Sequence, residues 1–171
     1  MTSAEPASKV QEATLMICIL QVDGMRFAID ANCVCEVLGD TTPRPVPLAP
    51  GYIHGILSYR GDILTALSLR KLLGSKAIAS KCCVLVLTDQ ETDERFGIVV
   101  DSVAGLLTLS RSAIEPNPGS LDPQSTFLFN GLYRTDSGLV VRLNPHHLKP
   151  LQIANAGLFD PTPIATAGWA Q

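Results

Sequence analysis

The sequence has few charged residues and no long hydrophobic run. Charged side chains make up 17% of the 171 residues, the formal net charge is −3, and Lys and Arg form no run. A surface for nucleic acid needs a concentrated basic patch, so a nucleic-acid partner is not indicated. The apolar stretch 13–20 is far shorter than the roughly 20 residues of a membrane helix. We therefore expect a cytoplasmic protein without direct membrane insertion.

Motifs for catalysis, cofactors and phosphate binding are also missing. His146 and His147 are adjacent, whereas metal ligands on a helix need a spacing of four residues. No glycine-rich loop precedes a long helix. The stretch 68–71 matches the Ser-x-x-Lys pattern of β-lactamases, but the partner motifs are absent, so Ser68 is better explained as a helix cap. We expect no catalytic residues, no cofactor and no metal.

The five cysteines are an odd number, which argues against a disulfide framework. Cys18, Cys82 and Cys83 lie in apolar runs, where a reduced thiol acts as a small hydrophobic side chain. Cys33 and Cys35 are expected on one face of a strand. With a histidine they leave a metal-binding or enzymatic protein as the least favoured alternative, because zinc requires further soft ligands.

What the sequence does contain is a series of short apolar segments separated by turn residues. Asp23-Gly24, Arg60-Gly61-Asp62 and the stretch 135–138 each separate two such segments, as in β-hairpins. We count about ten short strands on this pattern. Several are apolar at consecutive positions, which is typical of strands buried on both faces. This predicts a mostly β fold of two small barrels that share an apolar seam.

Helix is scarce, and no long amphipathic stretch supports a coiled coil or a bundle. The best candidate is Ser68–Leu73, with Ser68 as the N-cap and Gly74 just past the end. Asn144-Pro145 predicts a second short helical turn that Pro150 stops. The stretch 110–114 predicts a third turn.

The ends of the chain and one internal loop are rich in residues that disfavour regular structure. Residues 1–12 and 154–171 are predicted to be flexible tails around a domain of residues 13–153. Thr41–Gly51 contains four prolines, so we expect an extended loop or edge there. Gly105 predicts a bulge in its strand.

Two polar residues stand out in this apolar pattern. Glu36 interrupts the strand that contains Val34, and Arg60 lies at a hairpin tip between Tyr59 and Gly61. Arg and Tyr are residue types that protein interfaces favour, so these positions suggest a partner-binding surface. A solvated turn arginine and a glutamate near a helix explain the same residues equally well.

The order of several short motifs resembles the CheW-like domain family of bacterial chemotaxis. The first half carries FAID, VCEVL, PVPLAPGYIHGILSYRGDIL and LSLRKLLG, and the second half carries FGIVVDSVAGLL and FLFNGLYRTDSGLVVRLNPHHL. The similarity extends from Leu15 to Leu151. It implies two packed five-stranded SH3-like β-barrels with a few short helices.

The resemblance also implies a function. The family is a non-catalytic adaptor that couples a CheA-type histidine kinase to the cytoplasmic tip of methyl-accepting chemoreceptors. The positions that match the family's partner-binding motifs, together with Tyr59 beside them, are Arg60, Gly61, Glu36, Val34, Gly55 and Val103. Ser58-Tyr59 replaces the family's Asn-Leu before Arg-Gly. A CheW-fold scaffold of a non-flagellar pathway, such as twitching or gliding motility, is therefore the alternative.

Overall fold

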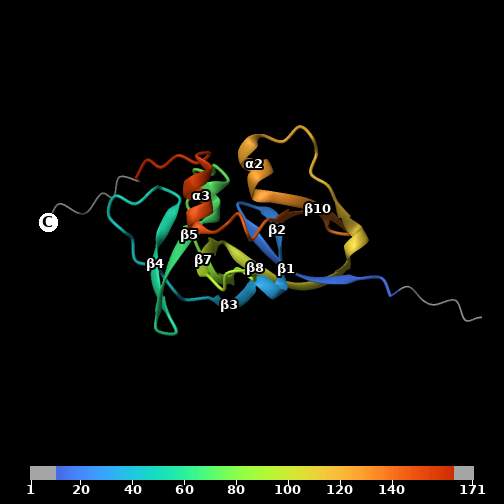
Figure 1. The fold of residues 1–171 in the computed structure, drawn as a ribbon, viewed down its shortest axis with the longest axis horizontal. Coiled ribbons are helices and arrows are strands. Elements are labelled where there is room, and N and C mark those ends of the chain that lie inside the picture. The colour runs from blue at the N-terminus through green and yellow to red at the C-terminus, as the bar shows by residue number, and fades with distance from the viewer. Residues whose placement is uncertain (1–10, 164–171) are drawn as a thin grey trace, which may run out of the picture.

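The structure is a computed structural model that describes residues 11–163, and these residues form two β-sheets packed side by side (Figure 1). In spatial order, the six-stranded sheet contains β8 (Ser102–Ser110), β1 (Thr14–Val22), β2 (Met25–Asp30), β11 (Gly138–Leu143), β10 (Phe129–Thr135) and β9 (Ile114–Glu115). The five-stranded sheet contains β3 (Val34–Leu38), β6 (Cys83–Thr88), β7 (Arg95–Val100), β5 (Asp62–Ser68) and β4 (Ile53–Tyr59). The chain starts in the first sheet, builds the second and returns, so the two units are intertwined.

The mostly β fold is thus confirmed, with one sheet larger than expected. The sixth strand, β9, has only two residues and pairs with Leu132 and Tyr133 of β10. Two residues carry no periodic signal, so the pattern gave about ten strands in all, and five in each barrel was what the family resemblance implied.

Three apolar clusters confirm the expected seam between two barrel-like units. Strand β6 shows the arrangement, because its alternate side chains enter different clusters. Cys83, Leu85 and Leu87 join the largest cluster, whereas Val84 and Val86 join a smaller one inside the five-stranded sheet. In β1, even-numbered residues from Cys18 to Val22 enter the large cluster, and odd-numbered residues from Leu15 to Ile19 enter a third. The large cluster is therefore the seam that both sheets share.

The helices are short and cover this seam. They are α1 (Leu69–Leu72), α2 (Pro123–Leu128) and α3 (Pro150–Ala156), with 3₁₀ turns at Ala31–Cys33 and Arg111–Ala113. The predicted cap is confirmed, since the Ser68 side chain accepts a hydrogen bond from the Lys71 amide, and Gly74 has a φ of 77° past the helix end. The third predicted turn corresponds to the 3₁₀ turn that Ser110 caps.

Other local predictions are confirmed as well. Asp23 and Gly24 both have positive φ, 53° and 76°, as a type I′ hairpin turn requires. The strand register shifts where Ile19 pairs with Gly105 but Leu20 pairs with Val103, which is the expected bulge.

The prediction that Pro150 stops a helix is wrong. Pro150 is the first residue of α3, where its missing amide hydrogen costs no hydrogen bond and its fixed φ suits the helix. The stretch after Asn144 is a turn rather than a helix. Helix α2 was not predicted, although Asp122 caps it and Pro123 follows at its first position, which is a readable start signal.

The predicted C-terminal boundary at residue 153 lies within α3. Beyond the helix, Phe159 is 9% exposed and belongs to the seam cluster, with its ring 6.4 Å from Tyr52 and 6.0 Å from Phe127. Residues 1–10 and 164–171, including Trp169, lie outside the described residues, so the predicted tails remain predictions there.

Tyr133 lies in the interior of the six-stranded unit, and its substitution tests whether its buried hydroxyl is hydrogen-bonded. Its side chain is fully buried, and its hydroxyl has no hydrogen-bond partner among the described residues. We expect Tyr133→Phe to leave the free energy of unfolding unchanged or to raise it by up to about 1 kcal/mol, because an unsatisfied buried hydroxyl is removed. Urea unfolding measures this, with Tyr59→Phe as the control that removes a satisfied hydroxyl. A loss above about 1 kcal/mol for Tyr133→Phe would show that the hydroxyl is in fact bonded.

Candidate partner-binding site

Glu36 on β3 meets Tyr59 at the end of β4 and Arg60 in the following turn, although β3 and β4 are opposite edges of the five-stranded sheet. The Tyr59 hydroxyl donates a hydrogen bond of 2.9 Å to Glu36 Oε2, and Arg60 Nη2 lies 3.2 Å from the same oxygen. Strands β3 and β4 are the two edges of this sheet, so the contact brings its edges together and the sheet curls toward a barrel. The three polar residues predicted from the sequence therefore form one cluster.

The cluster combines a buried ring with an exposed charge. Tyr59 is only 6% exposed, whereas the Arg60 side chain is 70% exposed and its guanidinium carbon lies 5.1 Å from the Tyr59 ring centre. Burial, and then the hydrogen bond to Glu36, raise the pKa of the Tyr59 hydroxyl, so Tyr59 stays neutral at physiological pH. An exposed ion pair of this kind contributes little to folding, about 0–1 kcal/mol.

The backbone at the hairpin tip adopts a conformation that is unfavourable for arginine. Arg60 has a φ of 50° and Gly61 a φ of 90°, the type I′ pattern that glycine, asparagine and aspartate favour. For other residues this conformation costs roughly 1 kcal/mol. An arginine therefore occupies a turn position that its own conformational preference disfavours. Backbone strain of this kind is often found at functional sites.

The other predicted residues lie in two different settings. Val34 and Val103 are partly buried and pack on the seam cluster, Val34 from β3 and Val103 from β8 in the other sheet. Gly55 is buried, and a Cβ built on it would lie 2.4 Å from the Arg44 carbonyl oxygen. The structure thus brings Glu36, Tyr59, Arg60 and Gly61 together, whereas Val34, Gly55 and Val103 support neighbouring packing.

Exposed apolar side chains occur on the two strands that carry the cluster and on the neighbouring strand β5. Val37 of β3 is 42% exposed, Ile56 of β4 is 36% exposed, and Ile63 of β5 is 67% exposed and pairs with Ser58. Apolar area next to Arg and Tyr is the composition of an interface centre. Sequence reasoning did not name these residues, although the alternation along Ile56 to Ile63 carried the signal.

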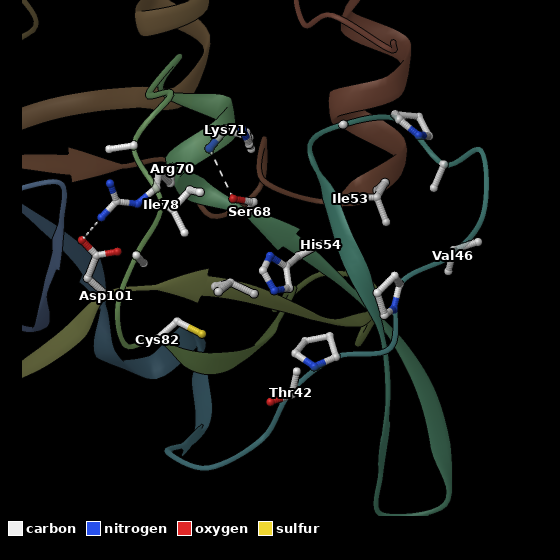
Figure 2. A pocket seen from close by; sticks show the side chains of 18 of the residues that line it. Thr42, Val46, Ile53, His54, Ser68, Arg70, Lys71, Ile78, Cys82 and Asp101 are labelled. Atoms are coloured by element: carbon white, nitrogen blue, oxygen red, sulfur yellow. Dashed lines mark hydrogen bonds and ion pairs between the residues drawn. The ribbon is translucent and has the colours of Figure 1, made fainter. Parts of the chain in front are cut away.

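A second feature, which the sequence did not indicate, is a cavity of 410 Å³ beside β4. One wall is the proline-rich loop, whose expected edge position is confirmed because Arg44 pairs with Ile56 of β4 through hydrogen bonds of 2.7 and 2.9 Å. The opposite wall is the stretch 77–82. Figure 2 shows His54 between these walls, with Val46 on one side and Ile78 and Cys82 on the other. We call this cavity the proline groove.

Two lining residues of the proline groove, Arg70 and Asp101, belong to a charge cluster that links the two sheets. Arg70 of α1 donates to Asp101, which follows β7, and pairs with Asp23 of the β1–β2 turn at 3.0 Å. Asp101 also accepts from the Asp23 amide at 2.7 Å. Burial opposes ionisation of Asp101, but the hydrogen bonds from Arg70 and from the Asp23 amide outweigh it and lower the pKa of Asp101. One guanidinium thus faces two carboxylates, so Arg70 does not fully balance the charge of the cluster.

The described residues can be searched for a metal-ligand group and for a membrane-spanning helix. Residues 11–163 contain no group of three or more His, Cys, Asp or Glu side chains that could hold a metal ion. Cys33 is buried at the end of its 3₁₀ turn, whereas Cys35 is exposed on β3, so the two thiols do not share a face. Within the same part of the chain, no helix is long and apolar enough to cross a membrane.

Two intertwined barrel-like β units, with a polar cluster on one of them, define a double-barrel β module. A family model for the CheW-like domain matches residues 17–150, and the chain belongs to this family. The solved structure of the scaffolding protein TtCheW from Thermoanaerobacter tengcongensis has the same fold. Its TM-score is 0.71 at 24% identity, over 79% of this chain and 92% of that one.

Curated relatives agree with this family. The chemotaxis protein CheW of Rhizobium meliloti is 31% identical over 98 residues, which are 57% of this chain and 63% of that protein. The chemotaxis protein CheW of Treponema pallidum is 24% identical over 144 residues, 81% of this chain and 84% of the relative. Protein FrzA of Myxococcus xanthus is 30% identical over 101 residues, 57% of this chain and 61% of the relative.

Proposed function

We propose that this protein is an adaptor that couples chemoreceptors to a CheA-type histidine kinase, and that Glu36, Tyr59 and Arg60 form part of its partner-binding surface. Such an adaptor has no catalytic role and acts in the cytoplasm, where it reaches membrane receptor arrays through its partners. Family membership supports the general role, since several relatives are named chemotaxis protein CheW.

The observation that carries the site is the arrangement at the β4–β5 hairpin. An exposed arginine is kept in a strained turn, stacked on a buried tyrosine and aimed at a glutamate from another strand. The fold gains little from this exposed pair. Interfaces, by contrast, often use Arg and Tyr as their main anchors. We therefore attribute the unfavourable backbone conformation of Arg60 to a role in partner binding.

Arg60→Glu is expected to weaken binding to the cognate kinase or receptor tip at least about tenfold, because it places two carboxylates side by side at the interface. The free energy of unfolding should change by less than about 0.5 kcal/mol. The matched control is Arg134→Glu, since Arg134 is also exposed and pairs with Glu115 at 2.6 Å in the other sheet. Isothermal titration with the purified partners measures both affinities. If the two variants bound the partner with equal affinity, Arg60 would not be part of the binding site.

Arg60→Asn separates binding from stability. Asparagine suits the positive φ of this turn, so the variant should be more stable than the natural chain by a few tenths of a kcal/mol to about 1 kcal/mol. It should bind its partner more weakly, because the guanidinium is gone. If Arg60→Asn lost both stability and binding, the hairpin would matter through its folding and not through partner contact.

A scaffold in a pathway other than chemotaxis is the second candidate. It is favoured by one relative, Protein FrzA, which does not carry the chemotaxis name. Purification of the protein with its bound partners from the source organism distinguishes the two: a kinase together with chemoreceptors supports the first candidate, and components of a surface-motility system support the second.

A further inference from the structure

The proline groove is apolar and open, and the described part of the chain ends beside it. Leu48 and Ile78 on its walls are 88% and 96% exposed, and Val46 is 39% exposed. Of its charged lining residues, Arg70 and Asp101 pair with each other, whereas Lys71 is exposed. An uncovered apolar surface of this kind in a folded protein marks a binding site for another apolar segment.

The segment after α3 is fixed to the body at two points as it approaches the groove. Phe159 is buried against Tyr52 and Phe127. Three residues later, the Thr162 carbonyl accepts a hydrogen bond of 3.1 Å from the amide of Gly51, a residue that lines the groove. Figure 1 shows this segment lying toward the loop between β3 and β4. The described segment therefore reaches the rim of the groove at Thr162.

Residues 164–171, with the sequence IATAGWAQ, match the groove in chemistry and in reach. They contain no charged side chain, and Trp169 is the one tryptophan of the protein. Eight extended residues span roughly 26 Å, enough to cross a cavity of this size. A tethered segment also has an effective concentration in the millimolar range, so modest apolar contact is sufficient for binding.

We propose that residues 164–171 bind in the proline groove of the same molecule, with Trp169 as the apolar anchor between the proline-rich loop and Ile78. In this proposal the groove is filled by the protein's own C-terminal segment. The proposal does not depend on the partners proposed above. An external peptide, or the same segment from a second copy, would be the competing occupants.

Trp169 fluorescence in the full chain tests the proposal without background from other tryptophans. In the folded protein the emission should be blue-shifted, and the acrylamide quenching constant several-fold lower, relative to the chain unfolded in guanidinium. Ile78→Asp should move both values most of the way to the unfolded reference. Ile63→Asp is the matched control, because Ile63 is also exposed but lies at the β4–β5 hairpin, outside the groove lining. It should behave like the natural chain.

Three results would overturn the proposal. An emission in the folded protein that already equals the unfolded reference would show that Trp169 is not bound. Equal effects of Ile78→Asp and Ile63→Asp would place Trp169 elsewhere. A blue shift lost on hundredfold dilution would show that a second copy supplies the segment. Persistence of the shift on dilution supports binding within one molecule.

Discussion

Lys149→Met is expected to lower the free energy of unfolding by about 3–5 kcal/mol, because it leaves the carboxylate of Asp89 buried without its cation. Both side chains are nearly inaccessible, at 7% and 5% exposure, and the Lys149 ammonium donates directly to Asp89. The pair joins the β6–β7 turn to the residue before α3, so its loss should also loosen the helix. Urea unfolding at neutral pH measures the effect.

The control for this variant is Lys81→Met, at an exposed lysine, where we expect a change within about 0.5 kcal/mol. The double variant Asp89→Asn/Lys149→Met should be more stable than the sum of the two single changes predicts, because the uncompensated charge is gone. A Lys149→Met variant as stable as Lys81→Met would show that Asp89 is satisfied without the lysine.

The same Asp89–Lys149 pair makes the free energy of unfolding depend on pH in the acid range. The hydrogen bond from Lys149 and the amide of Glu91 lower the pKa of Asp89 from 3.8 to about 2. A lowered carboxyl pKa contributes stability that is fully present above the unfolded value and is lost as the pH falls through the folded value. The natural chain should therefore lose this contribution between about pH 4 and pH 2, whereas Lys149→Met should show little of it.

Gly55→Ala is expected to destabilise the fold by about 1–3 kcal/mol, because a methyl group at this position has no room. Its Cβ would lie 2.4 Å from the Arg44 carbonyl oxygen and 2.7 Å from the carbonyl carbon. The backbone of the proline-rich loop would have to move, and the two hydrogen bonds that join Arg44 to Ile56 would break. Thermal unfolding measures the loss, and faster hydrogen exchange at these two amides locates it.

Gly39→Ala is the matched control, since a Cβ at Gly39 meets no atom within 4 Å. The two alanine variants would have equal stability if the loop could move at no cost. The result bears on the role of Gly55, which the family resemblance associates with partner binding. The geometry supports an indirect contribution, in which Gly55 allows the loop to lie against β4 and any effect on binding follows from the loop's position.

Short-range features were readable from the sequence because they depend on neighbouring residues. The Asp23-Gly24 turn, the Ser68 cap and the bulge at Gly105 were all predicted correctly. Each rests on a local rule of backbone conformation or hydrogen bonding. The error at Pro150 has the same origin, because proline both ends helices and begins them, and only the packing of Ile153 in the seam selects the second role.

Polar contacts between distant residues could not be derived in the same way. Glu36 and Tyr59 are 23 positions apart, and Asp89 and Lys149 are 60 apart. Each pair meets only because the sheets curl and the seam brings separate segments together. The sequence marked Glu36 and Arg60 as unusual, but it could not show that one carboxylate oxygen binds both the tyrosine and the arginine of the hairpin.

The amino-acid sequence by itself determined most of the strands, several of the turns and the burial of strands on both faces, because the alternation of apolar residues and the φ preferences of Gly and Pro act over a few residues. The tertiary structure alone decided the contacts of Glu36 with Tyr59 and Arg60, the buried Asp89–Lys149 pair and the proline groove. These depend on how two curled sheets close and pack, and many sequences with the same local pattern would bring different side chains together there.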